Sequence, residues 1–273
     1  MTPLTFDEIG YWSELKLAIV EKYGAAYTSI LKKQRLKKYY IDAFSGPGIH
    51  VSKTSGKKIE GSPARALKVS PPFDGYYFID LEEQKTDHLK QLFGNRQDVH
   101  IYTGDATTHL LTDVLPPITY ENYKRALCLL DPYGLHLDWG VIRQAGKSRA
   151  IDLFLNFPVM DMNRNAFWRN PDAVPRDGID RMTRFWGDDS WKQVAYAESP
   201  QPDFFGPTEM VKQSNEAIMA AFRERLKNVA GFQSVAEPLP MRNSNNAVVY
   251  YLFFASQKSV AQKIITEIFA KYR

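Results

Sequence analysis

Short apolar segments that alternate with helix-length stretches constrain the fold of this chain more than any other feature. Each is rich in aliphatic and aromatic residues, which predicts a buried β-strand. They lie at Lys38–Ala43, Tyr76–Ile79, Val99–Tyr102, Ala126–Leu130, Ile151–Leu155 and Ala247–Phe254. Because parallel neighbours need a crossover connection, usually a helix, the alternation predicts the α/β class. We expect a doubly wound, mostly parallel sheet with helices on both faces.

Acidic residues mark four of the predicted strand ends. Asp42 lies within the first strand, Asp80 and Asp131 directly follow the second and fourth, and Asp105 lies just beyond the third. Ligands of doubly wound sheets bind at the carboxyl ends of the strands, so this edge is the candidate site. Asp80 is placed to accept hydrogen bonds from ribose hydroxyls. Asp105 either accepts from an exocyclic amine of a base or forms a turn after Gly104.

The loop after the first strand contains Gly46 and Gly48, which allow the backbone to approach a ligand closely. The dinucleotide-binding pattern is excluded, because its third glycine would fall at Val51. A phosphate-binding loop at Gly56-Lys57 is excluded as well, because Lys58 stands where Ser or Thr is required. These observations favour a ligand that carries a nucleoside but no phosphates.

Composition argues against several other classes of protein. No stretch approaches the roughly 18 apolar residues of a membrane span, and the N-terminal residues lack a signal-peptide pattern, so we expect a cytoplasmic protein without a membrane partner. The single cysteine, Cys128, excludes an internal disulfide, and its apolar neighbours favour a buried structural role over a nucleophile. The histidines never fall at a metal-ligand spacing, so we expect no metal.

A series of motifs follows between about Tyr39 and Phe157: Asp42-Ala-Phe-Ser-Gly-Pro-Gly48, Gly61-Ser-Pro63, Phe78-Ile-Asp80, Gly104-Asp105 and Leu130-Asp-Pro-Tyr133. In this order they resemble the three-Cys-motif partner protein (TcmP) family, itself similar to class I S-adenosylmethionine-dependent methyltransferases. The resemblance implies a Rossmann-like, seven-stranded sheet whose last strand is antiparallel, and S-adenosylmethionine as cofactor. The implied cofactor contacts are Asp42, Phe44, Gly46, Gly48, Asp80, Asp105 and Ala106.

Asp131-Pro132-Tyr133 carries the predicted chemistry. It resembles the [DN]-P-P-[YF] motif of methyltransferases that act on exocyclic amines of bases. An aryl amine is a poor nucleophile, and a carboxylate and a proline carbonyl that accept its hydrogens help to localise its lone pair. Tyr133 is expected to stack on the base. The D-P-[FY]-G form is closer to enzymes that methylate guanine N2 in transfer RNA, whereas Gly61-Ser-Pro63 is closer to the adenine-N6 family of 23S ribosomal RNA, so the base stays open.

Basic residues crowd near the N-terminal third of the chain and are candidates for binding RNA or DNA phosphates. They are Lys32, Lys33, Arg35, Lys37 and Lys38. Tryptophans and arginines are frequent between Val159 and Pro207, which suits a cap that grips a substrate by stacking and phosphate contacts, although aromatic residues are more often part of a core.

We treat the chain as one methyltransferase-like domain. It has N-terminal helices (1–37), a cofactor-binding core (38–158), a helical cap (159–210) and C-terminal helices and strands (211–273). The first helix is expected to start at a capping box, Thr5–Glu8, and a second to span Ala25–Lys33. These helices are expected to close over the cofactor, with Lys16 contributing.

The alternative to an enzyme is an interaction protein that keeps this fold and acts through a partner. The resemblance raises this alternative, because the family is named for a companion protein that bears three cysteines. The companion's cysteines are absent from this chain.

Overall fold

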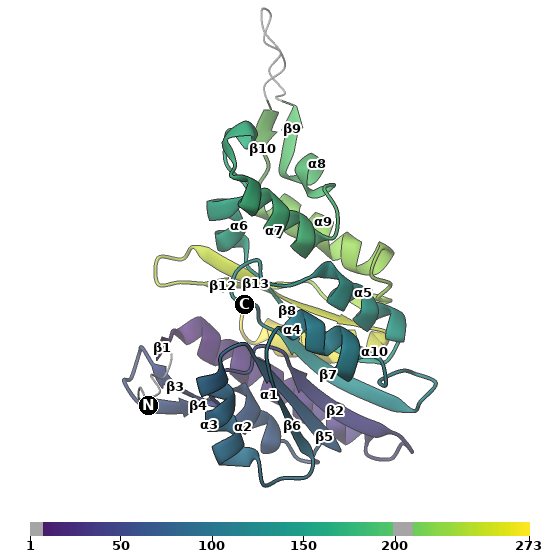
Figure 1. Ribbon diagram of the computed structural model, residues 1–273. Helices are drawn as coiled ribbons and strands as arrows, with labels where there is room; N and C mark the ends of the chain where they lie inside the picture. Colours follow the sequence, from purple (N-terminus) through teal and green to yellow (C-terminus); the bar gives the residue numbers. More distant parts are fainter. Residues whose placement is uncertain (1–7, 199–209) are drawn as a thin grey trace, which may run out of the picture.

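The computed structural model describes residues 8–198 and 210–273 of the chain (Figure 1). At its centre lies an eight-stranded sheet whose long strands follow the order β13-β8-β7-β2-β5-β6. These strands are the predicted ones, each within two residues of its expected bounds. They are β2 (Lys37–Asp42), β5 (Gly75–Asp80), β6 (Val99–Thr103), β7 (Lys124–Leu130), β8 (Ile151–Phe157) and β13 (Val248–Ser256).

The strand directions confirm a doubly wound, mostly parallel sheet whose last strand is antiparallel. β2 is parallel to both β5 and β7, β6 is parallel to β5, and β8 is parallel to β7. β13 is antiparallel to β8. The outer position beside β13 is shared by two short strands, β11 (Ser234–Val235) and β12 (Leu239–Arg242), which gives eight strands instead of seven.

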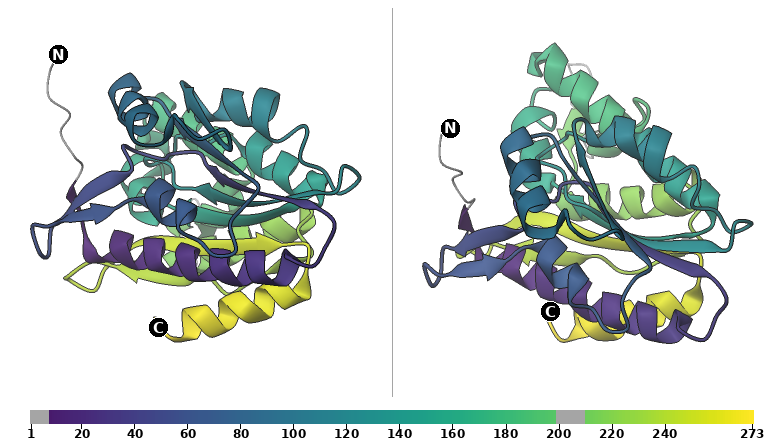
Figure 2. Two further views of the ribbon diagram at one scale, coloured as in Figure 1. Left: turned by 90° about the horizontal axis from the view of Figure 1, so that it is seen from below. Right: turned by 60° about the horizontal axis from the view of Figure 1, so that its bottom comes forward.

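Helices cover both faces of the sheet, and alternate residues of each strand pack against them. Within β7, Leu127 and Leu129 face one apolar cluster, whereas Cys128 and Leu130 face the other. The first face carries α1 (Tyr11–Leu31), α2 (Ser62–Leu67), α3 (Glu83–Phe93) and α10 (Ser259–Ala270), and Figure 2 shows α1 and α10 side by side. The other face carries α4 (Ala106–His109), a π-helical turn (Leu110–Val114), α5 (Trp139–Ser148) and α9 (Asn215–Asn228).

The N-terminal region differs from the prediction of two helices. A single helix, α1, runs from Tyr11 to Leu31 and passes through Gly24. A side chain at Gly24 would meet Val69 and Leu127 at ordinary contact distance, so packing supports the helix through this residue. Glu8, the expected end of a capping box, lies instead in β1 (Glu8–Ile9), which pairs with β3. Thr5 lies outside the described residues.

The segment after the glycine loop contains a hairpin that sequence patterns do not reveal. It consists of β3 (Ile49–Ser52) and β4 (Lys58–Glu60), which are short and mostly polar. Gly61 is the N-cap of the following helix, and Ser62 lies inside α2. Its hydroxyl is therefore free to bond elsewhere.

The cap region lies beyond one end of the sheet (Figure 1). It consists of α6 (Val159–Asn165), a 3-10 turn (Pro171–Ala173), α7 (Arg176–Trp186), α8 (Trp191–Ala195), β9 (Tyr196–Glu198) and β10 (Met210–Lys212). β9 and β10 pair as an antiparallel ribbon.

Candidate active site

A pocket of about 490 Å³ opens at the carboxyl ends of the central strands. Its wall contains several predicted site residues: Phe44, Gly46, Asp131, Pro132 and Tyr133. Lys16 of α1, Asn156 of β8 and Tyr250 of β13 complete the wall from other parts of the chain. The pocket therefore joins the loop after β2 to the residues after β7, as expected for adjacent parallel strands.

Asp131 is held in place by two donors. Nζ of Lys16 forms an ion pair with Oδ2, and Nδ2 of Asn156 donates to Oδ1 at 2.8 Å. The Lys16 side chain is only 6% exposed, and its Nζ also lies 5.6 Å from the centre of the Tyr250 ring. Both carboxylate oxygens of Asp131 thus have a partner inside the pocket wall.

Asp42 is fully buried beside this pocket, and only one of its two carboxylate oxygens accepts a hydrogen bond from the described residues. Its Oδ1 accepts from the amide of Phe44 at 3.4 Å, whereas its Oδ2 has no partner among the described residues. Burial raises the pKa of Asp42 to about 7; the nearby Ser62 hydroxyl opposes this shift, and the negative charge of Asp131 adds to it. A buried oxygen without a donor is costly, which makes this atom a candidate ligand contact.

Asp80 and Gly46 fix the loop after β2. The amide of Gly46 donates to Oδ2 of Asp80 at 2.8 Å, and the amide of Glu82 donates to Oδ1 at 3.0 Å. Gly46 has a φ of 63°, a conformation that side chains disfavour. Asp80 lies beneath the loop and not in the pocket wall. A carboxylate has lone pairs for further bonds, so its expected role toward a ribose stays a prediction.

Asp105 acts in the structure as the N-cap of α4. Its Oδ2 accepts from the amide of Thr108 at 2.8 Å and from the hydroxyl of the same residue at 2.9 Å. This is the local role that the sequence left open. Asp105, Ala106 and Gly48 lie outside the wall of the pocket.

Tyr133 is 61% exposed, and its ring lies 5.4 Å from Nζ of Lys85 on α3. The next residue, Gly134, has a φ of 58°, and a Cβ there would come within 2.5 Å of Oδ2 of Asp161. The positive φ favours glycine at this turn, and a side chain there would also have to displace the Asp161 carboxylate.

The predicted basic cluster is not brought to the pocket. Lys32, Lys33 and Arg35 follow the C-terminal end of α1, and β2 begins at Lys37. These residues therefore lie at the amino ends of the strands, the opposite edge of the sheet. Lys37 and Lys38 are both paired with Asp74, at 3.5 and 3.2 Å.

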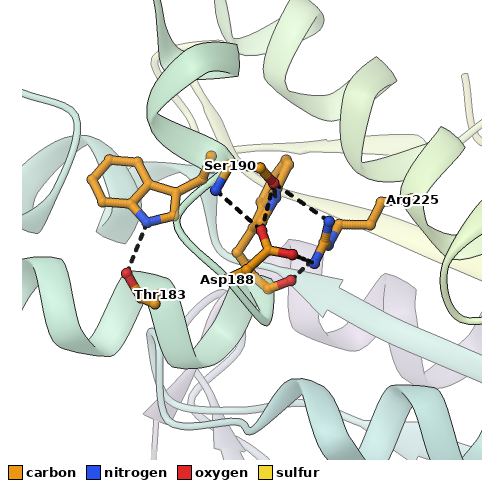
Figure 3. A network of polar contacts seen from close by, with 6 residues as sticks. Thr183, Asp188, Ser190 and Arg225 are labelled. Carbon is orange, nitrogen blue, oxygen red and sulfur yellow. Dashed lines mark hydrogen bonds and ion pairs between the residues drawn. The ribbon is translucent and has the colours of Figure 1, made fainter.

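Two tryptophans of the cap, Trp186 and Trp191, are buried and belong to its core, whereas Trp168 is half-buried. Figure 3 shows the polar contacts of Thr183, Asp188, Ser190 and Arg225 in this region. The indole of Trp186 donates to Ser190 at 3.0 Å, and Arg225 binds Asp188 at 2.5 Å. These side chains hold α7, α8 and α9 together. Among the cap arginines, Arg164 lines the pocket.

Other sequence expectations concern reactive groups. Cys128 is buried, and burial raises the pKa of its thiol, in agreement with a structural role. Within residues 8–198 and 210–273, no group of three or more His, Cys, Asp and Glu side chains is arranged to hold a metal ion. Among the helices of the same residues, none has the length and apolarity needed to cross a membrane.

The sequence reasoning missed Asn156, Tyr250 and Ser62. Asn156 carried a usable signal, because it is a polar residue at the end of an otherwise apolar strand that follows the Asp131 strand. Ser62 lies in the motif Gly61-Ser-Pro63, which was noted without a role for its hydroxyl, and Tyr250 gave no such signal.

Solved structures share this fold at low sequence identity. Protein LPL1258 from Legionella pneumophila, of the DUF519 family, matches 94% of this chain and 91% of its own with a TM-score of 0.53 and 11% identity. The N-methyltransferase NodS from Bradyrhizobium japonicum, solved with S-adenosyl-L-homocysteine, matches 91% of this chain and 89% of its own with a TM-score of 0.40 and 10% identity. No family model and no curated protein matches the chain. The described strand order and directions are those of a Rossmann-like, doubly wound sheet with an antiparallel last strand.

Proposed function

We propose that this chain is an S-adenosylmethionine-dependent methyltransferase that acts on an exocyclic amine of a nucleic-acid base. One observation carries the proposal: Asp131-Pro132-Tyr133 and the glycine loop after β2 line the same pocket. Methyl transfer requires the methyl donor and the acceptor amine to meet in one cavity.

The residues around the loop suit the cofactor. Asp42 presents a buried oxygen without a donor, which matches a ligand that carries a positively charged ammonium group. The open backbone at Gly46 and the acid at Asp80 suit a nucleoside. When bound, S-adenosylmethionine supplies an electrophilic methyl group.

Asp131 and Pro132 would orient the acceptor. The carboxylate and the proline carbonyl accept the two hydrogens of the amine, which helps to localise the nitrogen lone pair, and the carboxylate opposes the positive charge that develops on nitrogen. Lys16 now occupies Oδ2 of Asp131, so the amine has to replace the ammonium group there. Asn156 keeps Oδ1 in position meanwhile.

Calorimetry with S-adenosylmethionine and its demethylated product tests the cofactor site. Asp80→Ala should weaken binding by about 1.5–3 kcal/mol, as expected for hydrogen bonds to a charged group. Asp87→Ala is the matched control, because Asp87 is exposed on the neighbouring α3 and is paired with Lys90 of the same helix. Equal affinities of the two variants would remove Asp80 from the site.

Transfer of a labelled methyl group to RNA and DNA oligonucleotides tests the substrate. An amine paired in a duplex must be flipped out to reach a strand-end pocket, at a cost of a few kcal/mol. Unpaired loops should therefore be labelled faster than perfect duplexes. Loops with a single guanine or a single adenine separate the two bases that the motifs leave open.

The basic cluster should bind phosphates of a long substrate. β2 has six residues and spans roughly 20 Å, so only an extended nucleic acid reaches from the cluster to the pocket. Changing Lys33 and Lys37 to Glu should weaken binding and flatten its salt dependence, which is about −0.7 per phosphate on single strands. The same changes at two other exposed lysines, Lys263 of α10 and Lys271 directly after it, are the control.

A partner-dependent protein is the second candidate, and one observation favours it. Both oxygens of Asp131 are already bound by Lys16 and Asn156, which is a state that a companion protein could release by moving α1. A chain that binds S-adenosylmethionine but labels no oligonucleotide would favour this candidate. A companion with a three-cysteine motif should then be required for transfer.

A further inference from the structure

A second pocket, of about 280 Å³, lies at the amino ends of the strands, on the opposite edge of the sheet from the candidate active site. It is enclosed by the second half of α1, the first half of α10 and the start of β8. α1 and α10 lie side by side (Figure 2), and residues of both helices line the pocket. No residue of this pocket belongs to the proposed methyl-transfer site.

Three cationic side chains converge on one aromatic ring in this pocket. Arg125, Arg149 and Lys258 lie 4.0, 6.0 and 5.6 Å from the ring of Tyr120. Within the described part of the chain, none of the three has a carboxylate within ion-pair distance. The carboxylate in the wall, Asp152, accepts from Tyr23 and Ser256, each at 2.5 Å, and its single negative charge balances only one of the three cations. The pocket therefore keeps an excess of positive charge.

A buried hydroxyl in the same wall has no partner. Tyr27 is 7% exposed, and its phenol oxygen makes no hydrogen bond among residues 8–198 and 210–273. Such a group costs free energy unless a ligand supplies the partner. α10, which has twelve residues, also begins here without a side-chain cap, so the positive end of its dipole faces the pocket.

The remaining wall is apolar and partly open to solvent. Ile30 and Val260 flank the mouth and are 46% and 51% exposed, and Leu31 and Ile264 continue the wall inward. Exposed aliphatic side chains beside unpaired cations favour a ligand that has both an apolar body and a negative head.

We propose that this pocket binds a small organic anion, with a phosphate or carboxylate head at Arg125, Arg149 and Lys258 and an apolar body between Ile30 and Val260. The negative head pairs with the three cations and accepts from amides of the first turn of α10. The Tyr27 hydroxyl donates to the head or to a polar atom next to it. The volume is close to the lower end of ordinary ligand pockets, about 300 Å³, so the ligand is small.

A fluorescent probe with this architecture, 8-anilinonaphthalene-1-sulfonate, tests the site on the full chain. Lys258→Ala should weaken its binding about ten-fold or more, because a charge-assisted contact is lost. Lys263→Ala removes an exposed lysine of the same helix that does not line the pocket, and it should bind as the unchanged chain does. Equal affinities of the two variants would overturn the proposal.

Competition against the probe identifies the head group. Phenyl phosphate and benzoate carry the same ring, so their difference in displacement reports whether a phosphate or a carboxylate is preferred. Failure of both to displace the probe from the unchanged chain would also overturn the site.

Tyr27→Phe separates a ligand contact from a structural role. Removing a buried hydroxyl that has no partner should leave the free energy of unfolding of the free protein unchanged or higher. The same variant should bind the probe several-fold more weakly. A variant that is less stable than the unchanged chain, or that binds the probe equally well, would contradict the proposed contact.

Discussion

Each edge of the sheet carries an aspartate whose pKa is raised by desolvation, Asp152 at the amino edge and Asp42 at the carboxyl edge, and the two carboxyl groups differ in how they are satisfied. At the amino edge, both oxygens of Asp152 accept short hydrogen bonds, from Tyr23 and Ser256. At the carboxyl edge, one oxygen of Asp42 has no partner among the described residues. Burial raises the pKa of both groups, to about 6 for Asp152 and to about 7 for Asp42.

The difference separates an acid whose surroundings are complete from one that awaits a ligand. Asp152 ties α1 to β8 and β13 through its two donors, and that is a packing role. Asp42 lies behind the loop that shapes the candidate active site, where an unfilled acceptor favours a function. Substituting each of the two aspartates separately tests whether their roles differ in this way.

The pH dependence of stability should show the largest effect. The pKa of Asp42 rises from 3.8 in the unfolded chain to about 7 in the folded one, so folding favours its protonated form. The resulting stability is present below pH 4 and is lost as the pH rises to about 7, an effect of about 4 kcal/mol. Asp42→Asn should remove this loss in urea unfolding at a series of pH values.

Asp152→Asn is the matched change at the other edge. The pKa of Asp152 is raised to about 6, so folding favours its protonated form as well. Stability is therefore lost as the pH rises from about 4 to 6, an effect of about 3 kcal/mol. The fall in stability between pH 6 and 7 therefore belongs to Asp42. If Asp152→Asn abolished that part of the fall, our assignment of the two groups would be reversed.

Substitution of Asp131, unlike that of Asp42 or Asp152, should change the rate of methyl transfer more than the stability of the fold. Asp131→Ala removes the acceptor of the substrate amine, and loss of such stabilisation lowers a rate about 10²–10³-fold. Affinity for S-adenosylmethionine should change little, because the loop at Gly46 is untouched. Methylation by this variant at the unchanged rate would refute the mechanism, and Asp152→Asn, which should keep the rate, controls for general destabilisation.

The long strands could be predicted from sequence, because a buried parallel strand is a continuous apolar run whose length and turns are visible locally. The strand-end acids and the glycine loop could be predicted as well, because they lie next to these strands in the sequence. The sequence predicts two helices where the structure has only α1 in this region, because the packing around Gly24 comes from residues distant in sequence. The β3–β4 hairpin was missed, because short polar strands lack an apolar pattern.

The contacts that complete the pocket could not be predicted in the same way. Lys16 reaches Asp131 across 115 positions of sequence, and Tyr250 approaches from the last strand. Such contacts depend on how α1 and β13 pack, and no local spacing reports them. The role of the cap could not be predicted from composition, because a high content of tryptophan and arginine is found both in binding surfaces and in buried networks such as the one around Arg225.

The smallest predicted effect concerns Asp105, where a local and a ligand role overlap. Asp105→Ala removes the N-cap of α4 and should lower the free energy of unfolding by about 1 kcal/mol. Asp105→Ser keeps a capping oxygen and should restore most of that stability, but it lacks the carboxylate that would accept from the adenine amine. Urea unfolding reports the cap, and calorimetry with S-adenosylmethionine reports the contact. If serine restores stability but not cofactor affinity, Asp105 contacts the cofactor; if it restores both, Asp105 belongs with Asp152 among the acids whose role is structural.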